Sequence, residues 1–223
     1  MTTSNEMNKQ LMLEWLKTQN TLTDEQSCLV SQLFSENLSL VLYKMLDAVK
    51  SDRNSFSDPV YGISYIKEND KYKATVNSSS AFFSKDQLND IFCAAADIFC
   101  SVLPIGSVVK LRKDINDTAS QDKDPIIMID RRYVYANENS RAFYTYSGIT
   151  YPFGSFTDCI RFNFTPYAVA EVVHKGYSNE TEEAFVFKAK DEMIVKMKMH
   201  SFSCSNAEDE KDFMNSCSGD KTL

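Results

Sequence analysis

The sequence predicts an α+β protein, and three observations support that class. Apolar residues recur at helical spacing near the N-terminus, VYGISYIKE and KYKATV predict a β-hairpin near 60–76, and strand-like segments dominate from about residue 104. The predicted architecture is a helical N-terminal part with this hairpin, followed by a small curved antiparallel sheet or barrel-like C-terminal part with a terminal helix. The corresponding division is a mainly helical region 1–103, a β-rich domain 104–200 and an acidic tail 201–223.

Two capping signatures place helix starts. Thr23 and Ser84 are each followed three positions later by glutamine, and this pairing satisfies free amide groups of a first helical turn. The first signature predicts a long amphipathic helix over 24–50. The second predicts a helix that ends at Pro104, because proline has no amide hydrogen and restricts the residue before it. The mostly polar stretch 77–83 is expected to be a loop.

The second half contains three strand-like segments and two further predicted helices. The strands are IGSVVKLRK, PIIMIDRRYVYA and RAFYTYSGITYP. FTPYAVAEVVHKGY predicts a short helix that begins at Thr165 and Pro166 and ends near Gly176. SNETEEAFVFKAKDEMIVKMK predicts the terminal helix, because it has acidic residues at its start and lysines at its end. The tail 201–223 is small, polar and acidic, so it is expected to be disordered.

Charge and apolar content exclude several classes of function. The formal net charge is −7 and the pI is about 4.9, so the chain is not expected to attract nucleic acid. The longest apolar stretch is interrupted by Asp97 and ends at Pro104, and we expect no membrane insertion. The N-terminus lacks a basic segment followed by an apolar one, and we expect a cytoplasmic protein.

Motifs that carry chemistry are missing from the sequence. The six cysteines form no CxxC pair, and there is neither a phosphate-binding glycine loop nor a nucleophile elbow. The cysteines are therefore expected to be reduced thiols, and no cofactor or metal is expected. Asp90, Asp97 and Asp130 are the carboxylates with the best claim to acid–base chemistry, but their mixed-charge surroundings favour solvated positions. The protein is not expected to be an enzyme.

Aromatic and arginine residues concentrate between 131 and 156. Tyrosine and arginine often anchor protein interfaces, and alternation along a strand leaves one face for solvent. The alternative is that aromatic residues simply favour strands. The candidate protein-binding residues are Arg131, Tyr133, Tyr135, Arg141, Tyr144, Tyr146, Tyr151 and Phe153.

A series of short motifs runs from Leu103 to Phe185. They are LPIGSVVKL, IIMIDRR, YSGITYPFG, FNFTPYAVAEVVHKGY and SNETEEAF, and together they resemble the bacterial family called domain of unknown function four-one-seven-six. The pattern departs at the polar segment DINDTASQDKD and at Arg131, where the family usually has glycine before the arginine matched by Arg132. The resemblance implies a small barrel or curved sheet whose turns are set by Gly106, Gly148, Pro152, Gly154 and Gly176.

The resemblance also implies a function. This family is found in Gram-positive bacteria near type VII secretion genes and the LXG-type toxins that they export. The chain is therefore expected to be a non-enzymatic accessory protein that binds a secreted toxin encoded nearby, or another secretion partner, as an export chaperone or adaptor. One alternative is an immunity protein that neutralises the toxin domain. Another is a small barrel that binds nucleic acid through Arg131, Arg132 and Arg141. Each of these hypotheses is compatible with a homo-oligomer.

Overall fold

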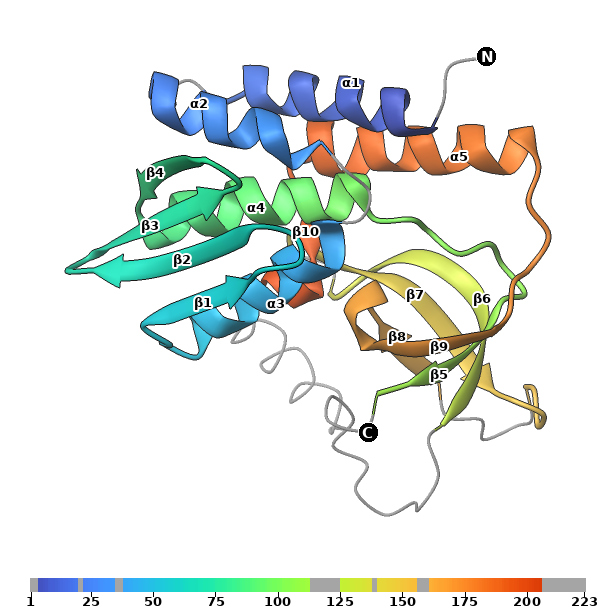
Figure 1. The fold of residues 1–223 in the computed structure, drawn as a ribbon. Helices are drawn as coiled ribbons and strands as arrows, with labels where there is room; N and C mark the ends of the chain where they lie inside the picture. Colours follow the sequence, from blue (N-terminus) through green and yellow to red (C-terminus); the bar gives the residue numbers. More distant parts are fainter. Residues whose placement is uncertain are drawn as a thin grey trace. The chain divides into compact units, whose positions relative to one another are not determined.

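The protein is an α+β protein, as predicted, and its chain divides into two compact units (Figure 1). The computed structural model describes residues 4–19, 22–34, 38–112, 125–137, 140–155 and 161–205. Residues 102–186 form the second unit, and the described residues on either side of it form the first. The second unit is therefore an insertion in the sequence of the first. The polar segment 114–124 and the predicted tail beyond residue 205 lie outside the described residues.

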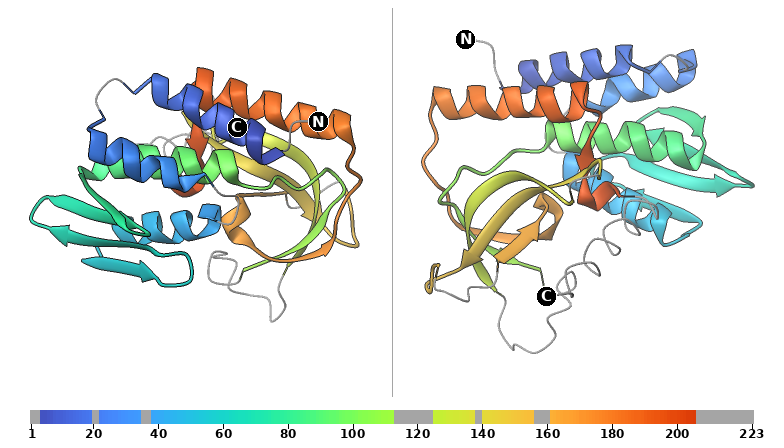
Figure 2. Two further views of the ribbon diagram at one scale, coloured as in Figure 1. Left: turned by 45° about the horizontal axis from the view of Figure 1, so that its top comes forward. Right: turned by 180° about the vertical axis from the view of Figure 1, so that it is seen from behind.

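Helices and a four-stranded antiparallel meander build the first unit (Figure 2). The helices and helical turns are α1 (Ser4–Lys17), α2 (Asp24–Val30), η1 (Ser31–Leu33), α3 (Ser39–Lys50), α4 (Lys85–Phe99), η5 (Asp191–Lys196) and η6 (Phe202–Cys204). The strands are β1 (Ser55–Asp58), β2 (Ile63–Glu68), β3 (Lys71–Val76), β4 (Ser79–Phe83) and the short β10 (His200–Ser201). Among the described residues, no helix has the length and apolar character needed to cross a membrane.

Helix α4 forms the centre of the first unit. It packs against α1, α3, β3 and β4, and every residue from Ile91 to Phe99 is buried. A helix that is surrounded on several sides buries more than one stripe, which explains this run of apolar residues. Both capping boxes are confirmed: the Thr23 hydroxyl accepts from the Gln26 amide at 3.2 Å, and Ser84 is bonded to Gln87 in the same way.

Two local predictions for this unit are wrong. The predicted continuous helix over 24–50 is interrupted, because α2 ends at Val30 and α3 begins only at Ser39. The interruption lets the two helices bury their apolar faces against different neighbours, α2 on β4 and α3 on α4. The predicted loop 77–83 contains β4, which pairs antiparallel with β3 and buries Ala81 and Phe83 in alternation.

A buried lysine closes the C-terminal end of α4. Lys190 is 3% exposed, and its Nζ donates to the backbone oxygens of Ile98 at 2.6 Å and Cys100 at 2.8 Å. The last carbonyls of a helix lack partners within the helix and carry partial negative charge. The ammonium group therefore satisfies the end of α4 by both hydrogen bonding and charge.

A disulfide joins Cys93 of α4 to Cys204 of η6, across 111 residues of sequence. The expectation that all cysteines are reduced thiols is therefore wrong for this pair, whereas Cys28 and Cys100 are free. The prediction that the disordered tail begins at residue 201 is wrong as well. Ser201, Cys204 and Ser205 are fully buried, because the disulfide and the η6 turn hold this segment in the first unit.

Removing this crosslink should destabilise the first unit. We expect Cys204→Ser to lower the free energy of unfolding by about 2–5 kcal/mol, because the bond restricts a long loop of the unfolded chain. Trp15 is the only tryptophan and is buried in this unit, so its fluorescence during urea titration in metal-free buffer reports the change. Wild type and variant should converge when a reductant is added. A difference that persists after reduction would contradict a role for the bond.

The second unit is a curled antiparallel sheet. Its strands are β5 (Val108–Leu111), β6 (Ile126–Tyr135), β7 (Ala142–Thr150), β8 (Arg161–Phe164) and β9 (Val169–His174), with the 3₁₀ turn η4 (Pro166–Ala168) before β9. They pair in the order β8-β7-β6-β5-β9. The last strand in sequence, β9, therefore pairs with the first, β5. The core contains Val109, Leu111, Ile127, Ile129, Tyr146, Phe164 and Ala168.

The prediction of a helix from Thr165 to Gly176 is wrong. Only η4 is helical, and the chain then continues as β9, which pairs with β5. The valine-rich VAEVVH has β-branched side chains that suit a strand, and β5 offers the pairing edge. The predicted terminal helix is confirmed as α5 (Glu180–Lys190), which continues into the π-helical turn η5.

Candidate protein-docking surface

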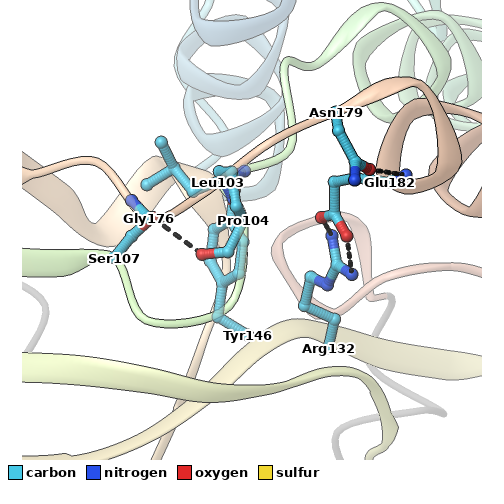
Figure 3. Close-up of polar contacts among 8 residues, drawn as sticks. All are labelled: Leu103, Pro104, Ser107, Arg132, Tyr146, Gly176, Asn179 and Glu182. Atoms are coloured by element: carbon cyan, nitrogen blue, oxygen red, sulfur yellow. Dashed lines mark hydrogen bonds and ion pairs between the residues drawn. The ribbon is translucent and has the colours of Figure 1, made fainter.

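A tight turn from Pro104 to Ser107 begins the second unit (Figure 3). Gly106 has φ +84°, a left-handed conformation that glycine adopts without steric cost. The Ser107 hydroxyl is fully buried, donates to the Pro104 carbonyl at 2.7 Å and accepts from the Gly176 amide at 2.9 Å. One hydroxyl therefore joins this turn to the segment that follows β9.

Gly176 is present because the two backbones almost touch. A Cβ atom at this position would lie 2.3 Å from the Ile105 carbonyl oxygen and 3.0 Å from the Ser107 nitrogen. Backbone atoms cannot rotate away as a flexible side chain can. Any larger residue would therefore push the 174–180 segment off the turn.

Tyr146 holds the same turn from inside the sheet. Its ring is 1% exposed and packs against Phe164 with 5.4 Å between ring centroids. Its hydroxyl accepts a hydrogen bond from the Leu103 amide at 2.9 Å. Tyr146 was expected on a binding surface, and that expectation is wrong. It is a core residue whose polar end orients the start of β5.

A shielded ion pair fixes the start of α5 to β6. The Arg132 guanidinium forms two hydrogen bonds with the Glu182 carboxylate, and the two side chains are only 5% and 22% exposed (Figure 3). The Glu182 amide donates to the Asn179 side chain at 2.9 Å, so Asn179 caps the helix. Phe185 covers the other side of the guanidinium, 5.0 Å away. Arg132 is thus engaged within the protein and is not available to phosphates.

These contacts fix the backbone that carries a set of exposed apolar side chains. Ile105, Val172, Val173 and Tyr177 are 50%, 45%, 50% and 81% exposed, and we call them the β9 patch. They belong to β9, the segment after it and the adjoining turn. Strand β9 pairs with β5 through two register shifts, so its pairing is bulged. Bulges bend a strand and discourage strand addition at an edge, which favours contacts through side chains.

The sequence-predicted binding residues do not form one face. Tyr135 and Arg141 lie at the end where β6 passes into β7, whereas Tyr151 and Phe153 follow the opposite end of the nine-residue strand β7. All four are exposed, and so is Arg131. The others, Tyr133 and Tyr144, are half-buried. The structure therefore divides the predicted aromatic surface into two separate exposed groups.

The β9 patch was not predicted from the sequence. Val172 and Val173 come from a segment predicted as a helix, in which they would form part of an apolar stripe, and Ile105 was predicted at the start of a strand. The signal that was available is the β-branched run in VAEVVH next to a glycine that permits close backbone approach.

The three carboxylates considered for acid–base chemistry, Asp90, Asp97 and Asp130, belong to different units. Asp130 belongs to the second unit and forms two hydrogen bonds with Arg161, at 2.6 and 3.0 Å. Asp90 and Asp97 lie on α4 in the first unit, and burial raises the pKa of both carboxyl groups. The expectation that Asp97 is solvated is wrong, since it is 5% exposed and bonded to Tyr43 and Ser201.

Gly176→Ala should disrupt the second unit more than an equivalent change elsewhere. We expect a loss of about 3 kcal/mol, because the added methyl meets backbone atoms. Gly154→Ala is the control: its Cβ would meet nothing within 4 Å, and only the left-handed backbone costs about 1 kcal/mol. Hydrogen exchange of the β5 and β6 amides measures the loss of stability in both variants. Equal effects would contradict the close approach at Gly176.

Arg132→Ala should cost about 3 kcal/mol, since it leaves a shielded carboxylate without its partner. The matched control is Lys110→Ala, which removes the more exposed ion pair with Glu171 and should cost less than about 1 kcal/mol. Hydrogen exchange of the first turn of α5 reports the loss. An unchanged α5 in the Arg132 variant would show that the pair does not hold the helix.

Comparison with known proteins agrees with this division of the chain. No curated protein and no solved structure matches it. One family model does, and its limits coincide closely with those of the second unit. Residues 102–185 of this chain match the family model of the Domain of unknown function (DUF4176), as the motifs from Leu103 to Phe185 indicated.

Proposed function

We propose that the protein is a non-enzymatic accessory protein that binds another polypeptide through the β9 patch. The observation that carries the proposal is the exposure of Ile105, Val172, Val173 and Tyr177 on a stretch of backbone that is held in place. Exposed apolar residues that gather on one surface mark interaction sites, and the Ile105 backbone lies against Gly176, in the segment that joins Val173 to Tyr177. Tyrosine at 81% exposure is a side chain suited to anchoring an interface.

The way the patch is built supports a binding role. The Ser107 hydroxyl, the Gly176 backbone and the shielded Arg132–Glu182 pair all restrict the segment between β9 and α5. A surface that is ordered before binding loses less conformational entropy when it binds. Within the family motifs, Ser107, Tyr146 and Gly176 are therefore structural, whereas the patch residues of the same motifs make the proposed contact.

The partner we propose is an LXG-type toxin or another component of type VII secretion, which the protein accompanies as an export chaperone or adaptor in the cytoplasm. The support is the family resemblance, whose members lie near such genes. Long helices of an exported toxin expose apolar stripes before assembly, and an apolar patch can cover such a stripe. The alternative remains an immunity protein, which would bind the toxic domain instead.

The test is co-purification of the full chain with the toxin encoded beside it, followed by affinity measurement. We expect Val173→Asp and Tyr177→Ala each to weaken binding at least tenfold, since they place charge in the patch or remove its most exposed ring. Tyr135→Ala is the matched control, because Tyr135 is also half exposed but lies outside the patch. Binding to the N-terminal helical part of the toxin supports the chaperone, and binding to its C-terminal domain supports immunity.

Three outcomes would overturn this assignment of the surface. Loss of binding with Tyr151→Ala or Phe153→Ala, and not with the patch variants, would move the site to the turn after β7. A dimer of this chain that Val173→Asp dissolves would assign the patch to self-association. Failure to retain the neighbouring toxin or any secretion component would remove the proposed partner.

A further inference from the structure

Three potential metal ligands converge inside the first unit. Cys93 and Asp97 lie four residues apart on α4, one helical turn, and Cys204 approaches them from η6. The two sulfur atoms and a carboxylate oxygen all lie within 4.8 Å of one another, and all three residues are buried. Cys93 Sγ lies 3.7 Å from Asp97 Oδ2. The spacing i, i+4 on a helix directs two side chains to one point, as in many helical metal sites.

The carboxylate of this cluster is buried, is held by hydrogen bonds, and lies close enough to His200 to interact with that side chain electrostatically. Asp97 accepts hydrogen bonds from the Tyr43 hydroxyl and, at 2.7 Å, from the Ser201 amide. A buried carboxylate is normally paired with a cation or bound to a metal, or else it remains protonated. A divalent cation at this point would offset two of the three negative charges that Asp97 and two thiolates carry.

We propose that Cys93, Asp97 and Cys204 form a binding site for a thiophilic divalent cation of the zinc type when the two cysteines are reduced. The disulfide is the oxidised state of the same site. A dithiol or phosphine reductant supplies two electrons, the sulfur–sulfur bond breaks, and two protons from solvent give two thiols. Metal binding then releases those two protons as the sulfurs become thiolate ligands.

The donor set selects the class of metal. Two thiolates favour zinc and similar ions, whereas calcium and magnesium require an oxygen-rich shell. Zinc commonly takes four ligands, and Ser201 Oγ lies 3.6 Å from Cys204 Sγ, beside the cluster. The fourth position is therefore filled by this hydroxyl or by a water molecule. Burial of the cluster favours a structural ion.

The free cysteine nearest in sequence does not compete for the metal. Cys100 is buried, and burial raises the pKa of its thiol to about 12, so it stays protonated near neutral pH. Its neighbour Lys190 already uses the adjacent carbonyls. The ion would instead connect α4 to η6, the same two elements that the disulfide joins. The C-terminal segment would then be tied to α4 in both oxidising and reducing surroundings.

The experiment uses the full chain with Cys28, Cys100, Cys159 and Cys217 replaced by serine, so that Cys93 and Cys204 are the only thiols. The protein is reduced with a phosphine, freed of reductant and titrated anaerobically with Co²⁺, then with Zn²⁺. We expect sulfur-to-cobalt charge-transfer absorption with tetrahedral d–d bands, saturation at one metal per chain, and displacement by Zn²⁺. The oxidised protein should bind none.

Two variants identify the ligands. Cys204→Ser in this background should abolish the charge-transfer band, and Asp97→Asn should weaken Co²⁺ binding at least tenfold while the disulfide still forms on oxidation. Circular dichroism shows whether each variant is folded. Should the quadruple-serine background fail to fold, the wild-type chain and Cys204→Ser are compared instead. Absence of cobalt absorption in the reduced, folded protein would overturn the proposal, and so would binding that neither Cys204→Ser nor Asp97→Asn changes.

Discussion

The contact between the Pro104–Ser107 turn and Gly176 is the constraint on which the second unit depends. It joins the first turn of the unit to the segment after its last strand, and therefore closes the sheet of β5 to β9. Only a residue without a side chain allows the approach, and only a buried hydroxyl that both donates and accepts satisfies the groups on both sides. The exposed apolar residues near this contact keep their positions because the backbone beneath them is fixed.

The local features that sequence can specify were predicted well. The two capping boxes depend on residues three positions apart, and both were correct. The hairpin of β2 and β3, the long strands β6 and β7 and the helix α5 follow from short-range periodicity or end charges. The family motifs were also correct, since their order and spacing are properties of the sequence itself.

The errors share one physical cause, which is that partners distant in sequence decided the outcome. VAEVVH becomes a strand because β5 offers an edge, and the serine-rich segment before α4 becomes β4 because β3 does. Cys93 meets Cys204 only when residues 111 apart fold together. The sequence of β7 does not show which face of the sheet Tyr146 occupies, and in the folded sheet this side chain is buried. The β9 patch was missed for the same reason, because its exposure depends on a bulged pairing that no periodicity shows.

The Cys93–Cys204 bond has one topological consequence. It closes a covalent ring that contains all of residues 102–186, the entire inserted unit. A peptide bond cut anywhere within that ring therefore leaves one molecule, and the two pieces part only after the sulfurs are reduced. A protease that trims the inserted unit in oxidising surroundings would nick the protein without releasing either end of the chain.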